Sequence, residues 1–282
     1  MARMTSKKAA TKKGGPPGSQ GNRYTRLIAH VFAAKHKPGM ETVEFARIEI
    51  EKAASNLSID LPKNLGDVIY TFRYRSELPA SISSKAPRGK HWIILPAGRS
   101  KYVFAATSEA EIVPNPKLSE TKIPDATPGL IIRHAMDDEQ ALLAKLRYNR
   151  LVDVFTGITC YSLQSHFRTQ VRGKGQSETD ELYVGVDARG VQYVLPVQAK
   201  GGKDRLSPVQ IIQDLDMCAQ KFPGLVVRPI GAQFMADDLI AMFELERIQS
   251  EIRIARERHY RLVEPEGVTA EELAQYMNRT KD

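Results

Sequence analysis

Residues 178–200 read ETDELYVGVDARGVQYVLPVQAK, and this segment is the strongest structural signal in the sequence. Two segments, 182–186 and 191–197, are rich in valine, tyrosine and leucine, which favour β-strands. The residues between them have turn composition and include a glycine that can adopt positive φ. The pattern predicts a β-hairpin, and a three-residue loop at 188–190 makes Asp187 face Val191.

The register of this hairpin is expected to gather polar side chains. If the same pairing continues toward the open ends of the strands, Asp180 lies opposite Gln198 and Glu178 lies opposite Lys200. Side chains alternate between the two faces of a strand, so these four are expected on one face and Glu181 on the other. The hairpin therefore predicts one small polar cluster.

Such a cluster is costly on a buried face unless it binds a cation or pairs internally. Carboxylate, amide and backbone carbonyl oxygens are hard ligands that suit Mg²⁺, which keeps several waters for chemistry. Lys200, beside a metal ion, would orient or deprotonate an attacking water, or offset charge developing on a phosphate. Together these residues are the parts needed for phosphodiester hydrolysis.

Asp180, then Gln198-Ala-Lys200 on the next strand, then a helix with Gln210 and Gln213, resembles the PD-(D/E)XK nuclease superfamily, in particular its type II restriction endonucleases. The resemblance covers roughly residues 137–235. It implies an α/β fold with a mixed central sheet flanked by helices. It also implies Mg²⁺ bound by Asp180 and Gln198, a catalytic Lys200, double-stranded DNA as substrate, and a homodimer that cuts both strands.

The sequence departs from the family pattern in two ways. No proline precedes Asp180, and Gln198 replaces the usual acid, which removes one negative charge from the site. Glu178, or Glu139 on the preceding helix, is therefore a candidate extra ligand, although an acid in a first helical turn also simply favours the helix dipole.

The two glutamines of the helix, Gln210 and Gln213, are spaced i, i+3 and share a face. If that face is directed at the site, they would position Lys200 or backbone phosphates. The alternative is a pair that faces solvent.

Composition sets wider limits. A chain of 282 residues with 42% hydrophobic content can bury a sizeable core and is long enough for two domains. Lys and Arg exceed Asp and Glu by 41 to 33, which suits a polyanionic partner. Cys160 and Cys218 lack metal-ligand spacing, so a reduced cytoplasmic setting is expected. No stretch approaches the roughly 18 apolar residues of a membrane span.

The N-terminal third is expected to recognise DNA. Residues 1–22 predict a disordered basic tail, either a solubilising terminus or an arm on DNA phosphates. Within 23–112, helices are expected from residue 24, over 42–57 and over 64–73, followed by a hairpin of 90–95 and 101–106. This order predicts an α+β winged-helix-like DNA-recognition domain. The alternative is a small α+β domain whose arginines only solvate its surface.

Basic and polar residues of three segments are candidates for DNA contacts. They occur around the third helix, in the turn of the hairpin, and in the flexible segment before Glu178, which is either a phosphate-binding loop or an ordinary turn. The candidates are Lys63, Asn64, Arg73, Arg75, Arg99, Lys101, Arg172 and Lys174.

Residues 113–128 contain four prolines and predict an extended linker. The nuclease domain is expected over 129–282. It should begin with a helix over 137–155, continue with a strand over 158–171 beside the hairpin, and contain a helix capped by Ser207. A strand over 225–230 should be parallel to its partner because a helix precedes it. Residues 239–263 are read as two strands or as helix, with strands favoured, and a short helix from Thr269 closes the chain.

The sequence therefore predicts an Mg²⁺-dependent endonuclease acting on double-stranded DNA, in particular a sequence-specific restriction enzyme. One alternative is a non-catalytic winged-helix DNA-binding regulator with a degenerate nuclease domain. Another is a repair or RNA nuclease of the same fold. Base readout depends on which side chains reach which groove, so no recognition sequence follows from the pattern.

Overall fold

The computed structural model describes residues 22–108, 111–134, 138–201, 204–235, 238–249 and 251–279. All but one residue of the expected basic tail and the first residue of the helix expected over 137–155 lie outside these ranges. The N-terminal part comprises α1 (Arg23–Lys35), β1 (Thr42–Ala46), α2 (Arg47–Leu57), α3 (Gly66–Tyr74), α4 (Ala80–Ser83), β2 (His91–Gly98) and β3 (Lys101–Thr107).

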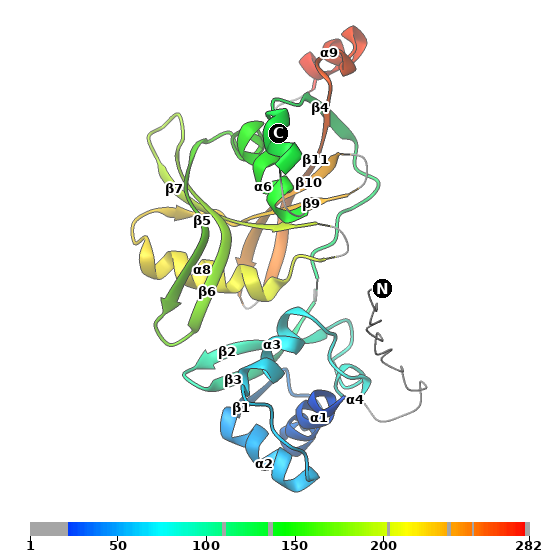
Figure 1. The fold of residues 1–282 in the computed structure, drawn as a ribbon, viewed down its shortest axis with the longest axis vertical. Helices are drawn as coiled ribbons and strands as arrows, with labels where there is room; N and C mark the ends of the chain where they lie inside the picture. The colour runs from blue at the N-terminus through cyan, green and yellow to red at the C-terminus, as the bar shows by residue number, and fades with distance from the viewer. Residues whose placement is uncertain are drawn as a thin grey trace, which may run out of the picture.

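A three-stranded antiparallel sheet of order β1-β3-β2 packs against these helices (Figure 1). The hairpin β2–β3 confirms the sequence prediction. The helix expected over 42–57 is wrong at its start, because residues 42–46 form β1. Val43 and Phe45 alternate with exposed neighbours and are buried against β3, which is strand periodicity. The helix begins only at Arg47, where Glu49 accepts a hydrogen bond from Ala46 N at 2.7 Å.

The C-terminal part is built on a larger sheet. Its elements are β4 (Glu120–Pro124), α5 (Gly129–His134), α6 (Asp138–Tyr148), α7 (Leu151–Thr156), β5 (Thr159–Val171), β6 (Gly175–Val186), β7 (Gln192–Lys200), α8 (Pro208–Lys221), β8 (Val226–Val227), β9 (Ile230–Phe234), β10 (Leu239–Ile248), β11 (Glu251–Val263), the 3₁₀ turn η1 (Pro265–Gly267) and α9 (Ala270–Met277).

The strand order of this sheet is β4-β11-β10-β9-β7-β6-β5, with the short β8 also beside β7. β7 is parallel to β8 and β9, and β4 is parallel to β11, while the other neighbours are antiparallel. The expected mixed α/β sheet flanked by helices is therefore confirmed. So are the strand before the hairpin, the parallel strand after α8, and the choice of strands for residues 239–263.

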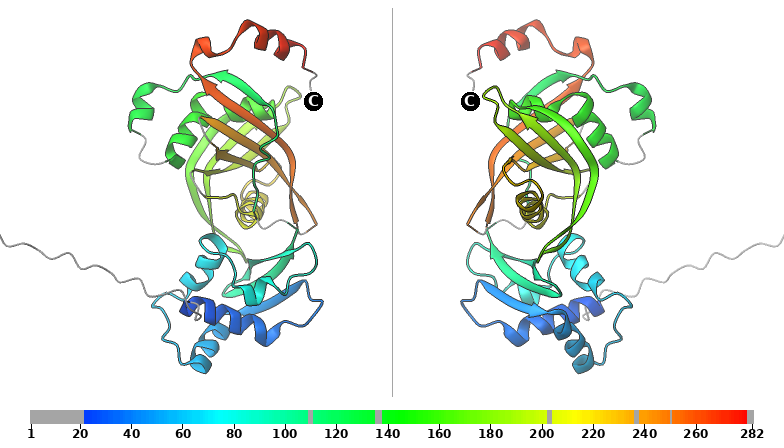
Figure 2. Two further views of the ribbon diagram at one scale, coloured as in Figure 1. Left: turned by 90° about the vertical axis from the view of Figure 1, so that its right-hand side faces the viewer. Right: turned by 90° about the vertical axis from the view of Figure 1, so that its left-hand side faces the viewer.

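Alternating side chains of the sheet form two cores. On β10, Ile240 and Met242 pack with α6 and α7, whereas Ala241 and Phe243 pack on the other face with α8. Ser207 caps α8 by accepting from Val209 N, as the sequence predicted. α8 lies against the concave face of the curved sheet (Figure 2). The two helical layers therefore cover opposite faces of the sheet, with α6 and α7 on one and α8 on the other.

Two expectations are corrected in the segment before the hairpin. The predicted linker includes β4, which pairs with β11. The predicted helix over 137–155 is broken into α6 and α7, with Arg150 at φ 50° between them. The Asn149 side chain lies at this break and donates to Asp125 and Thr127, which ties the end of α6 to the segment after β4.

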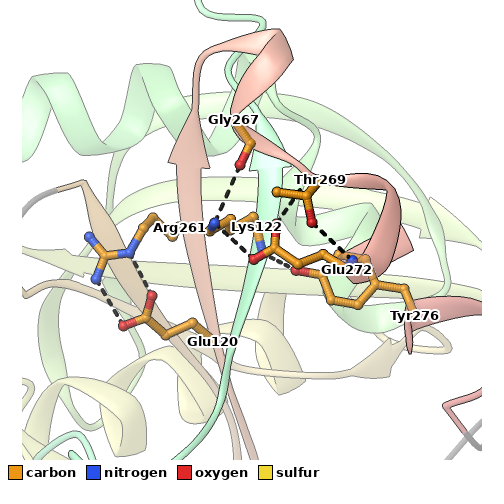
Figure 3. Close-up of polar contacts among 7 residues, drawn as sticks. All are labelled: Glu120, Lys122, Arg261, Gly267, Thr269, Glu272 and Tyr276. Atoms are coloured by element: carbon orange, nitrogen blue, oxygen red, sulfur yellow. Dashed lines mark hydrogen bonds and ion pairs between the residues drawn. The ribbon is translucent and has the colours of Figure 1, made fainter. Parts of the chain in front are cut away.

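Side chains of the helix α9 contact the edge strand β4 (Figure 3). The Tyr276 hydroxyl accepts from Lys122 N at 3.0 Å, and Lys122 Nζ lies 2.8 Å from Glu272. Arg261 holds Glu120 from the neighbouring strand. An unpaired strand edge is open to pairing with another chain, so these contacts protect the end of the sheet.

Candidate functional site

The site begins where β6 and β7 separate. Their pairing follows the predicted register from Val186↔Gln192 to Glu181↔Val197, and stops there. Asp180 Oδ2 instead accepts a hydrogen bond from Ala199 N at 2.8 Å, and Lys200 Nζ lies 3.6 Å from the same oxygen. β7 continues against β9. The structure thus brings Asp180 and Lys200 together, as predicted. They do not meet through continued strand pairing, because the Asp180 carboxylate lies between β6 and β7 where the two strands separate.

The alternation of side chains reverses at Asp180. Glu181 binds Arg147 of α6, whereas Thr179, two residues away, bonds Asp214 of α8 on the opposite face. The neighbouring strand is irregular at the same level, because His166 has φ 47°. The local geometry of two adjacent strands therefore overrides simple alternation.

Because of this reversal, the expectation that four side chains share one face is wrong for Glu178. Its carboxylate pairs with Arg168 at 2.7 Å and is 40% exposed. Its main-chain carbonyl does reach the cluster, where it accepts from Gln198 Nε2 at 3.2 Å.

Gln198 is fully buried, and both ends of its amide are hydrogen-bonded. Its Nε2 donates to Asp214 Oδ2 at 2.9 Å as well as to the Glu178 carbonyl, and its Oε1 accepts from Gln210 Nε2 at 2.9 Å. A backbone carbonyl only accepts, so the amide must place its NH₂ group on that side. Gln210 therefore joins the cluster as the sequence suggested.

Asp214 is the residue that sequence reasoning missed. It has no exposed surface, and burial raises its pKa to about 7; the charge of Asp180 acts in the same direction, and hydrogen bonds from Thr179 and Gln198 oppose it. Burial also raises the pKa of Asp180, against the opposing effect of Lys200. The spacing i, i+4 from Gln210 was the available signal, because it places both residues on one helix face.

The two remaining accessory candidates are not brought to this cluster. Gln213 accepts from the Tyr74 hydroxyl at 2.5 Å and donates to the Gln176 carbonyl at 3.3 Å, so it links α3 to α8 and β6. Glu139 lies in the first turn of α6, on the face of the sheet opposite α8. The partners of Asp180 and Gln198 come from β6, β7 and α8.

The donor set fits Mg²⁺ with few protein ligands. Within the described ranges, no three His, Cys, Asp or Glu side chains are arranged to hold a metal ion. Asp180 nevertheless has a second oxygen, Oδ1, that takes no hydrogen bond from the described residues, and the Gln198 oxygen keeps one lone pair beyond its bond to Gln210. Mg²⁺ is commonly held by one or two carboxylates together with substrate phosphates and water.

Two basic turns, distant in sequence, meet where β6 begins. A methyl group at Gly98 would lie 3.8 Å from the Gly173 carbonyl oxygen, so the turn of β2–β3 touches the turn of β5–β6. These turns carry four of the expected DNA contacts. Arg99, Lys101, Arg172 and Lys174 are exposed, and Lys174 also pairs with Asp216 at 3.2 Å.

The candidates around α3 divide into outward and inward side chains. Lys63 and Asn64 are exposed, and Arg75 is exposed over the Tyr70 ring at 4.8 Å. Arg73 is different, because its guanidinium packs over Tyr74 and two of its nitrogens are buried without a partner among the described residues. Burial lowers the pKa of Arg73. The expectation that Arg73 faces DNA is therefore wrong for this conformation.

Comparison with known proteins adds no relative. No protein-family model matches the chain, and neither the curated proteins nor the solved structures include a significant match. None of the helices described here has the length and apolar character needed to cross a membrane.

Proposed function

We propose that the protein is an Mg²⁺-dependent endonuclease that hydrolyses phosphodiester bonds of double-stranded DNA, in the manner of a sequence-specific type II restriction enzyme. The observation that carries the proposal is the pairing of Asp180 with Lys200 where β6 and β7 separate. The order of helix, three antiparallel strands, helix and parallel strand around this pair supports a restriction-endonuclease-like fold.

Three side chains divide the chemistry. Asp180 would hold the ion through Oδ1, with the Gln198 amide oxygen as the neighbouring donor. When bound, Mg²⁺ stabilises negative charge that develops on the phosphate. Lys200, only 13% exposed, would orient the attacking water or donate to a phosphate oxygen. Phosphoryl transfer depends on positioning and charge stabilisation more than on covalent help, so this small set suffices.

The N-terminal part would supply recognition as a winged-helix domain. Its order of helix, strand, three helices and hairpin, with β1 beside β3, supports this assignment, and β2–β3 would be the wing. Asp180 lies roughly 23 Å along the strand from Gly173, at ~3.3 Å per residue. That span matches about seven base pairs at ~3.4 Å each, so one duplex could contact the basic turns and the site together. Cutting both strands would require a homodimer.

Cleavage assays with matched variants test the proposal. Purified protein incubated with long duplex DNA should give discrete fragments with Mg²⁺ and none with EDTA. Asp180→Ala and Lys200→Ala should abolish cleavage and leave DNA binding largely intact. Asp60→Ala and Lys52→Ala, which change exposed residues of the N-terminal part, serve as controls and should cut like the wild type. Wild-type turnover in either site variant would overturn the assignment.

A second candidate function is a DNA-binding regulator with a degenerate nuclease domain. The observation that favours it is Gln198, which lacks a charge and already has every polar group hydrogen-bonded. Binding without cutting, in Mg²⁺ and in Mn²⁺, would favour this regulator. Cleavage of RNA or branched DNA instead of duplex DNA would indicate a repair or RNA nuclease of the same fold.

A further inference from the structure

Asp214 is a fully buried carboxylate that contacts the candidate site but has no part in the chemistry above. We propose that Asp214 is a positioning residue for the nuclease site. It fixes the amide of Gln198 so that the oxygen faces Gln210 of α8, and it supplies the negative charge that a glutamine lacks. This inference rests on the proposed function.

The first part of the inference follows from the hydrogen bonds of the amide. A glutamine amide has a donor end and an acceptor end, and only its neighbours decide which way it points. The donor end of Gln198 meets two acceptors, Asp214 Oδ2 at 2.9 Å and the Glu178 carbonyl at 3.2 Å. The acceptor end meets Gln210, which is partly exposed. Asp214 is the closer of the two acceptors that keep the oxygen on the side of Gln210.

The second part follows from the charge of Asp214. An asparagine at this position could accept from Gln198 and donate to the Thr179 hydroxyl, so the same contacts need no charge. A buried carboxylate without a basic partner is costly, and no ion pair to Asp214 exists among the described residues. Packing therefore does not explain the acid. The acid at position 214 is explained if the site must attract a cation and Asp180 is the one carboxylate in contact with it.

Both side chains are shielded from water, since Gln198 and Asp214 have no exposed surface. Salt screens such buried charges far less than exposed ones. Asp214 contacts Gln198 directly, and Gln198 lies two residues before Lys200 on β7. The acid on α8 thus acts on the site without needing to contact substrate.

Exchanging the acid and the amide tests this inference. Binding of Mg²⁺ alone, without DNA, would be measured by calorimetry at pH 8, where Asp214 is ionised, for the wild type, Asp214→Asn, Gln198→Glu and the double variant Gln198→Glu/Asp214→Asn. Asp214→Asn should weaken Mg²⁺ binding at least ten-fold. The double variant should restore it to within three-fold of the wild type, because it returns an acid to the strand and a hydrogen-bond donor to the helix. Asp153→Asn is the control. Asp153 lies on α7, on the face of the sheet opposite α8, so this variant should bind Mg²⁺ like the wild type.

Equal Mg²⁺ affinity of wild type and Asp214→Asn would overturn the inference, and so would a double variant as weak as Asp214→Asn. Thermal melts would accompany each titration. If Asp214→Asn does not fold, the double variant decides alone: affinity within three-fold of the wild type supports the inference, and a loss of ten-fold or more overturns it. If the wild type itself neither binds Mg²⁺ nor cuts DNA, the proposed function fails, and the inference fails with it.

Discussion

Burial of Asp214 predicts an unusual dependence of stability on pH in metal-free protein. The pKa of this carboxyl is raised from its ordinary value of 3.8 to about 7, chiefly by burial. Between these two values the folded state keeps a proton that the unfolded state has lost. The free energy of unfolding therefore rises as the pH falls through 7, and the full gain is present below about pH 4.

The shift sets the size of the effect. A shift of about three pKa units at ~1.36 kcal/mol each corresponds to about 4 kcal/mol in full. Roughly 3 kcal/mol of this falls between pH 8 and pH 5. Asp214→Asn removes the buried charge and retains the size of the side chain. At pH 8 the variant should therefore be more stable than the wild type, by about 2–3 kcal/mol after the loss of charge-assisted hydrogen bonds.

Urea unfolding in EDTA at pH 5, 6, 7 and 8 measures both quantities. The difference between wild type and Asp214→Asn isolates this residue, because other titrating groups contribute to both proteins. A variant that is less stable than the wild type at pH 8, or that keeps the full pH dependence, would refute the reasoning. In that case Asp214 would be a structural residue that is adequately paired.

Three further perturbations test other parts of the structure. Arg147→Met should lower the free energy of unfolding in urea by roughly 3–5 kcal/mol, because it leaves the fully buried Glu181 without its bidentate partner. Combining Arg99→Ala with Arg172→Ala should weaken binding to all DNA sequences alike and reduce the slope of log K against log salt by about 2, in filter-binding titrations. Tyr276→Phe should cost about 1 kcal/mol and speed amide hydrogen exchange in β4, because it removes the hydrogen bond to that edge strand.

Each perturbation has a matched control. Arg150→Met changes an exposed arginine and should lower the free energy of unfolding by under about 1 kcal/mol. A cost equally small for Arg147→Met would contradict the argument that the buried Glu181 needs this partner. Lys52→Ala should leave the slope of log K against log salt unchanged. An unchanged slope for the combined Arg99→Ala and Arg172→Ala variant would show that these two turns do not contact DNA. Tyr148→Phe, at an exposed tyrosine, should leave exchange in β4 as it is, whereas unchanged exchange in Tyr276→Phe would show that α9 does not protect the edge.

Local patterns predicted most of the fold. The turn composition at 187–190 and the valine-rich flanks were enough for the hairpin and its register, because two-strand pairing across a short loop is a local property. β1 was missed because a five-residue strand runs directly into the helical pattern of α2. β4 was missed because its partner β11 is more than 130 residues away in sequence, and prolines on either side favoured a linker.

The site was predictable only in part. Asp180 and Lys200 follow from the motif and the hairpin, and the structure brings them together. The Glu178 side chain points away from the cluster because β5 and β6 are irregular near Asp180. The spacing of residues in the sequence does not reveal this irregularity. The contact of Asp214 with Gln198 depends on how α8 packs on the sheet, which is tertiary information. The burial of the Arg73 guanidinium over Tyr74 is likewise tertiary information.

The most direct test of the central claim is the single-turnover cleavage rate of duplex DNA at saturating Mg²⁺ and saturating protein. The Asp180–Lys200 site predicts discrete products for the wild type, and a loss of about 10³-fold or more for Asp180→Ala and Lys200→Ala with DNA affinity retained. Cleavage at the wild-type rate by either variant, or cleavage that persists in EDTA, would contradict it.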